Sequence, residues 1–122
     1  MSKKRRIALI DDDGSFRTAL ADSLLSLGYS VKVFGSADDF AAAHSERSYD
    51  CIITDVHMPG ISGVELTKAL AARGSCVPII LITARTEPGL EAQVGLGGVI
   101  CLLKKPFGTK SLLRCLERAM PD

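Results

Sequence analysis

Five short apolar runs recur along the chain, and each has the length of a β-strand. They cover residues 7–10, 31–34, 51–54, 77–82 and 98–103. Four of the runs are apolar almost throughout, which is typical of parallel strands whose two faces are both covered by helices. The run at residues 31–34 alternates between apolar and polar positions instead, so we expect this strand near an edge of the sheet.

The segments between these runs have the spacing of amphipathic helices. Apolar positions predict helices over residues 16–27, 36–43, 62–74, 86–94 and 112–120. Ser62 and Glu65 have the spacing of a capping box, and Gly74 predicts the end of that helix. Because several glycines surround the few apolar anchors of residues 86–94, we expect that helix to be short or mobile.

Strands that alternate with helices predict an α/β domain with a parallel sheet. We expect a doubly wound, five-stranded sheet with the strand order 2-1-3-4-5, the flavodoxin-like (βα)5 arrangement, which places the alternating second strand at an edge. No linker-like segment divides the 122 residues, so residues 1–122 are expected to form a single domain.

Composition excludes several classes of protein. With 15 Lys and Arg against 14 Asp and Glu, the net charge of +1 gives no reason to expect nucleic-acid binding by this domain. No apolar run approaches the roughly 20 residues that a membrane span needs, and the basic start precedes too short an apolar stretch for a signal peptide. We therefore expect a cytoplasmic protein without membrane contact. The four cysteines lack metal-site spacing and are interpreted as structural thiols.

Polar residues follow four of the five predicted strands. Residues 11–13 are three consecutive aspartates after the first strand, Asp55 follows the third, Thr83 ends the fourth and Lys105 follows the fifth. Ligands of open parallel sheets bind beyond the carboxyl ends of the strands, so these groups are expected to meet. Clustered carboxylates favour a hard divalent cation such as Mg²⁺. An aspartate beside such an ion can attack phosphorus, and a hydroxyl and an ammonium group can bind the phosphoryl oxygens.

Taken together, these motifs resemble the receiver domain of two-component response regulators. The similar stretches are residues 7–13, residues 53–60 with Gly63, residues 81–84 and residues 103–107. The resemblance runs from Ile7 to about Met120 and implies a phosphorylation-dependent conformational switch in signal transduction. It implies a sensor histidine kinase as partner and a downstream protein effector, or an output domain outside this chain such as a DNA-binding helix-turn-helix. It also allows a phosphorylation-dependent dimer.

The resemblance also implies the roles of single residues at the phosphorylation site. Asp55 is the phosphoacceptor, and Thr83 and Lys105 bind the phosphoryl group. The Lys105–Pro106 peptide bond is expected to be cis. The domain is then not an enzyme, since it promotes only its own phosphotransfer and autodephosphorylation.

A metal site follows from the same resemblance. Asp12 and Asp55 would bind Mg²⁺ (or Mn²⁺) directly, and Asp11 would bind it through a water molecule. The backbone carbonyl of His57 would supply the remaining protein ligand.

Three positions bear on tuning and on the switch. Leu102 stands where the family usually has Tyr or Phe, so an aromatic lever for output is missing. His57 and Arg85, each two residues beyond a site residue, occupy positions that control water access to the phosphoryl group. For His57 we favour a space-filling imidazole over one that orients water. Arg85 is open between this gating role and a solvated surface charge.

Two other functions stay open from the sequence. Residues 11–15 match the DxDG[TS] opening of haloacid-dehalogenase-like phosphatases, in which Asp11 would be the nucleophile and Asp13 the general acid. The chain is short for that fold, and it lacks a late acidic motif. The second alternative is a receiver-like interaction module that is never phosphorylated.

Overall fold

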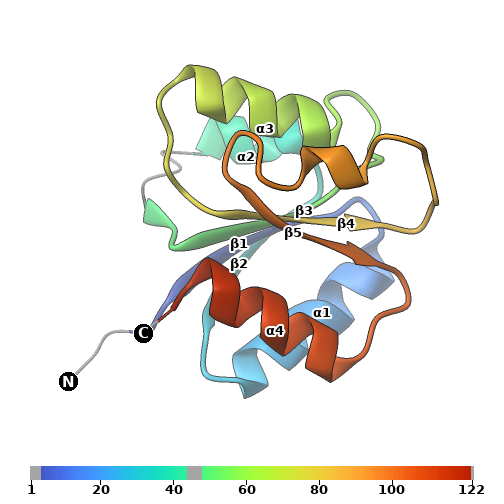
Figure 1. Cartoon of the computed structure of the whole chain (residues 1–122). Helices are drawn as coiled ribbons and strands as arrows, with labels where there is room; N and C mark the ends of the chain where they lie inside the picture. Colours follow the sequence, from blue (N-terminus) through green and yellow to red (C-terminus); the bar gives the residue numbers. More distant parts are fainter. Residues whose placement is uncertain (1–3, 44–47, 122) are drawn as a thin grey trace.

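The computed structural model describes residues 4–43 and 48–121, and these residues form one five-stranded parallel sheet (Figure 1). The strand order is β2-β1-β3-β4-β5, as the sequence predicts. The strands are β1 (Arg6–Ile10), β2 (Ser30–Phe34), β3 (Cys51–Asp55), β4 (Ile79–Thr83) and β5 (Val99–Lys104).

Helices cover both faces of the sheet, which gives the molecule three layers (Figure 1). Helices α1 (Gly14–Ser26) and α4 (Thr109–Ala119) pack on one face, and α2 (Ala37–Ala43) and α3 (Gly63–Ala72) pack on the other. Two apolar cores result, one on each side of β1, β3 and β4. Helix α3 begins with the predicted capping box of Ser62 and Glu65, and Gly74 follows its end with φ of 79°.

The two edge strands differ from the inner ones in burial. Strand β2 lies at one edge, as its alternating pattern predicts, and the side chain of Val33 is 45% exposed. Strand β5 forms the other edge, and Ile100 and Leu102 are only partly buried. The expectation that all four apolar strands have both faces covered is therefore wrong for β5.

The predicted helix at residues 86–94 is not formed, and this is the main difference from the expected (βα)5 pattern. A single 3-10 turn, η2 (Glu91–Gln93), takes its place, so the described residues contain four α-helices. Gly89 and Gly95 flank this turn at φ of 90° and 92°, a left-handed conformation that ends a right-handed helix. Two further glycines before β5 also have positive φ, so the chain reaches β5 as a loop.

The cysteines behave as the sequence predicts. Cys51, Cys101 and Cys115 are buried without a disulfide, and Cys76 is exposed. Burial raises the pKa of Cys51 and of Cys115 to about 12, so both remain thiols at neutral pH. No helix among the described residues has the length and apolar character needed to cross a bilayer.

Candidate functional site

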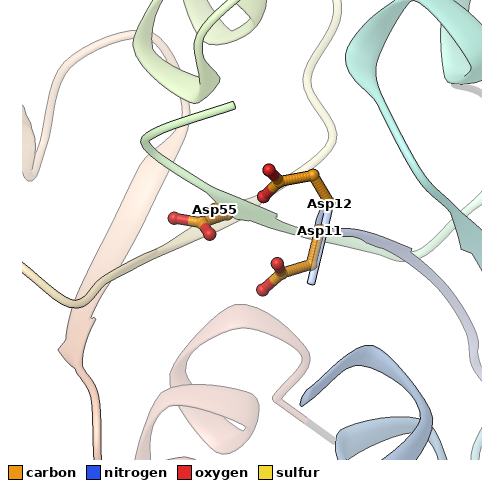
Figure 2. A group of neighbouring side chains, drawn as sticks. All are labelled: Asp11, Asp12 and Asp55. Carbon is orange, nitrogen blue, oxygen red and sulfur yellow. The ribbon is translucent and has the colours of Figure 1, made fainter. Parts of the chain in front are cut away.

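Three carboxylates meet at the carboxyl edge of the sheet (Figure 2). Asp11 directly follows β1, and Asp55 is the last residue of the neighbouring β3. Carboxylate oxygens of Asp11, Asp12 and Asp55 all lie within 4.8 Å of one another. The parallel register of the two strands thus brings together residues that are more than 40 positions apart, as the sequence predicts.

Asp11 is the fixed member of this cluster. Its side chain is fully buried, and its backbone N–H donates to the carbonyl of Phe34 at 3.1 Å. One carboxylate oxygen accepts from the backbone N–H of Asp13 at 2.9 Å, and the other accepts from Nζ of Lys105 at 3.0 Å. Arg17 donates to the carbonyl oxygen of Asp11 at 2.7 Å, which secures the start of the loop.

Asp55 is also buried, and its surroundings disfavour the charged form of its carboxyl group. Oδ1 accepts from the backbone N–H of His57 at 3.2 Å, and Oδ2 accepts from Nζ of Lys105 at 3.3 Å. Burial and the nearby charge of Asp11 raise the pKa of Asp55, although Lys105 and the His57 N–H act in the opposite direction. The ionised carboxylate of Asp55 is therefore destabilised in the folded protein.

Lys105 joins the two buried carboxylates. It follows β5, and the peptide bond between Lys105 and Pro106 is cis. Burial lowers the pKa of the Lys105 ammonium, but its hydrogen bond to Asp11 and the charges of Asp11 and Asp55 outweigh this effect and raise it. Lys105 is consequently protonated at neutral pH.

The other two aspartates of the run have different surroundings. Asp12 is exposed and turns a carboxylate oxygen toward the cluster. The side chain of Asp13 accepts from the backbone N–H of Phe16 at 3.1 Å and so caps α1. Asp13 is thereby committed to the helix, which counts against a role as general acid.

The donor set fits a hard divalent cation. Three carboxylates face one ammonium group, so the cluster has an excess of negative charge that Mg²⁺ or Mn²⁺ would offset. The backbone of His57 lies beside this cluster, because its N–H donates to Asp55. That the His57 carbonyl is a metal ligand stays a prediction.

Thr83 ends β4, where it is almost completely buried. Its hydroxyl donates to the backbone carbonyl of Arg85 and accepts from the Arg85 N–H, both at 3.0 Å. The hydroxyl is therefore bound to the loop that follows its own strand. Arg85 itself is exposed, and Lys104 of β5 binds the hydroxyl of Thr86 in the same loop.

An ion pair that the sequence analysis missed connects the loops after β3 and β4. Nε2 of His57 lies 2.9 Å from Oε1 of Glu87, and both side chains are partly exposed. The pair sets the imidazole of His57 against a carboxylate of the loop after β4. Neither residue type nor spacing could have signalled this pair, because Glu87 lies in the segment predicted as a helix.

Gly63 lies where the start of α3 meets the end of β3. Its N–H donates to the carbonyl of Val56 at 2.9 Å. A Cβ atom at this position would collide with the carbonyl oxygen of Asp55 and lie 3.1 Å from Cα of Val56. Only glycine lets the start of α3 approach β3, the strand that ends in Asp55, so closely.

Comparison with known proteins gives the same picture. A family model described as the response regulator receiver domain matches residues 7–117. The chain is 35% identical over 120 residues to the transcriptional regulatory protein FixJ of Bradyrhizobium diazoefficiens, covering 98% of this chain and 58% of FixJ. It is 33% identical over 114 residues to the transcriptional regulatory protein TdiR of Thauera aromatica, covering 93% of this chain and 50% of TdiR.

Solved structures agree in fold. The chemotaxis protein CheY4 of Vibrio cholerae superposes with a TM-score of 0.86 at 28% identity and covers 97% of this chain and 100% of CheY4. The response regulator StyR superposes with a TM-score of 0.88 at 33% identity, covering 96% of this chain and 59% of StyR.

This chain thus spans about half the length of the relatives FixJ and TdiR. Neither the phosphatase nor the unphosphorylated interaction module is favoured by these matches. The family match, the strand order and the acidic cluster agree, and the chain belongs to the response regulator receiver domain family.

Proposed function

We propose that Asp55 accepts a phosphoryl group from a phosphohistidine of a sensor histidine kinase. The observation that carries this proposal is the position of the Asp55 carboxylate, which lies within one acidic cluster and bonds Lys105. An oxygen of Asp55 attacks phosphorus in line, the bond between phosphorus and the imidazole nitrogen breaks, and the phosphoryl group is transferred to the carboxylate.

Asp11, Asp12 and Asp55, together with the His57 carbonyl, would hold the Mg²⁺ ion. When bound, the ion neutralises charge on the phosphoryl oxygens. The ammonium of Lys105, already at the acceptor, binds a phosphoryl oxygen as charge develops there.

The switch follows from the position of Thr83. Its hydroxyl is bound to the backbone of Arg85 in the unphosphorylated protein, so turning to the phosphoryl group costs both of those hydrogen bonds. Without these two hydrogen bonds, residues 84–98 are held less firmly to the end of β4 and can adopt a second conformation. Leu102 packs beside this segment and would follow its movement without an aromatic side chain.

The same proposal covers what the switch acts on and how it is reset. FixJ and TdiR are named transcriptional regulatory proteins, and this chain matches only part of each. We therefore expect the switch to act in the cytoplasm on a protein effector or on an output domain, for example one that binds DNA. Hydrolysis of the acyl phosphate resets the switch, and His57 and Arg85 control the access of water.

The test is intact mass after incubation with Mg²⁺ and acetyl phosphate. Wild type and an Asp22→Asn control, which changes an exposed aspartate of α1, should gain one labile phosphoryl group. Asp55→Asn should gain none, and EDTA should abolish the adduct on wild type and on Asp22→Asn. Absence of an adduct on wild type, both with acetyl phosphate and with a phosphorylated kinase, would contradict the proposal.

A further inference from the structure

An aromatic ring lies beneath the ammonium of Lys105. Phe16, in the first turn of α1, places its ring so that Nζ of Lys105 is 4.0 Å from the ring centroid. The ring of Phe107 meets Phe16 edge to face, with 6.0 Å between centroids and an interplanar angle of 77°. Phe107 lies two residues after Lys105, so one loop carries both the lysine and the second ring, which packs against Phe16.

The ring holds Lys105 in a different way from the carboxylates. A cation over an aromatic face is attracted by the ring's negative face, and this attraction needs no hydrogen bond. Asp11 and Asp55 each accept a hydrogen bond from the same ammonium group. The contact with Phe16 therefore does not compete with these carboxylates for the N–H donors of Lys105.

This difference matters when Asp55 reacts. Transfer converts the Asp55 carboxylate into an acyl phosphate, so Lys105 loses that partner and must donate to a phosphoryl oxygen nearby. The aliphatic stem of lysine has many rotamers, and confining it to one costs entropy. A ring contact that persists through the transfer keeps the ammonium at the acceptor.

We infer that Phe16 is a positioning residue for Lys105: its ring face holds the ammonium at the acceptor carboxylate before and during phosphoryl transfer. This inference rests on the function proposed above. Phe16 is also the first apolar position of the helix predicted over residues 16–27, and its ring packs against the core on the side of α1 and α4. Tests must therefore separate contact with the cation from packing.

The first test is nuclear magnetic resonance of the metal-free, unphosphorylated protein. The ε-methylene protons of Lys105 should be shifted upfield by the ring current of Phe16. Phe16→Leu should remove the shift and Phe16→Tyr should keep it. An unshifted Lys105 in wild type, or a shift that survives in Phe16→Leu, would overturn the inference whether or not the protein accepts phosphate.

The second test is the rate constant for phosphorylation by acetyl phosphate. Phe16→Leu should lower it about three- to tenfold, since a partly desolvated cation–π contact is lost, and Phe16→Tyr should restore it to within about twofold of wild type. In a Lys105→Met background, Phe16→Leu should have no further effect.

The control for packing is Phe40→Leu, which changes a buried ring in the core on the opposite face. It should lower the melting temperature without lowering the rate constant. An equal loss of rate in Phe40→Leu, or in Phe16→Leu on the Lys105→Met background, would overturn the inference. If wild type is not phosphorylated by any donor, the proposed function fails, and the magnetic resonance test alone decides the contact.

Discussion

Two regions at the carboxyl edge of the sheet differ in how firmly they are held. At the strand ends, Asp11 is fully buried, Asp55 is 7% exposed, and both carboxylates accept hydrogen bonds at each oxygen. In residues 84–98, Leu90 is buried but Leu96 is 57% exposed. Under the proposed function, we therefore expect the chemistry to be located on the rigid strand ends and the response to belong to residues 84–98.

A few polar contacts connect the two regions. The hydroxyl of Thr83 binds the Arg85 backbone, Lys104 binds Thr86, and His57 pairs with Glu87. Each contact joins a strand end or the loop after β3 to residues 84–98. A change at Asp55 can therefore reach residues 84–98 through contacts made by Thr83, Lys104 and His57.

The largest expected effect comes from adding one methyl group to the rigid region. Gly63→Ala would place a Cβ against the backbone of Asp55 and Val56, which cannot move without disturbing β3. We expect a loss of about 3 kcal/mol in the free energy of unfolding, together with slower phosphorylation. Urea denaturation measures the first and intact mass the second.

The matched change in the weak region is Gly89→Ala. Nothing lies within 4 Å of the added Cβ, and only the left-handed φ of 90° opposes it. We expect a loss of about 1 kcal/mol. Equal losses for the two variants would mean that the regions are held with similar firmness.

A smaller effect should appear in the pH dependence of Asp55→Asn. Burial and Asp11 raise the pKa of Asp55, so in wild type the stability of the metal-free protein falls as the pH rises through that raised pKa. Asn keeps an acceptor for the His57 N–H and carries no charge. In EDTA at pH 7 the variant should melt a few degrees above wild type, and the difference should close as the pH falls toward about 4. A variant that melts below wild type at pH 7 would refute this.

The smallest effect is expected from Glu87→Gln. Its partly exposed ion pair with His57 contributes about 0.5 kcal/mol. Loss of the pair should free residues 84–98 from the loop after β3, so that water reaches the acyl phosphate and its half-life shortens about twofold. Glu91→Gln, in the same segment, is the matched control for charge. A half-life that is unchanged, or changed equally in both variants, would show that the pair does not limit the access of water to the acyl phosphate.

The sequence predicted those features that depend on strand order. Continuous apolar runs indicated the inner strands, and the strand-end rule then placed Asp11 and Asp55 side by side without any alignment. The capping box of Ser62 and Glu65 fixed the start of α3, because that signal is local.

Features set by long-range packing were not predictable in the same way. The contact between Phe16 and Lys105 depends on how α1 docks against the loop after β5. The predicted helix at residues 86–94 failed because Gly89 and Gly95 take left-handed conformations, which outweigh a weak apolar period. The partial exposure of Leu102 follows from that missing helix.

The most direct test of the central claim is amide hydrogen exchange, measured in the metal-free protein and again after phosphorylation. We predict that amides of residues 84–98 exchange early in the metal-free protein, while those of β1 and β3 stay protected. Phosphorylation should change protection chiefly in residues 84–98. If that segment is as well protected as β3 before phosphorylation, or if phosphorylation leaves its exchange unchanged, then the response does not belong to the weakly held segment and the account is wrong.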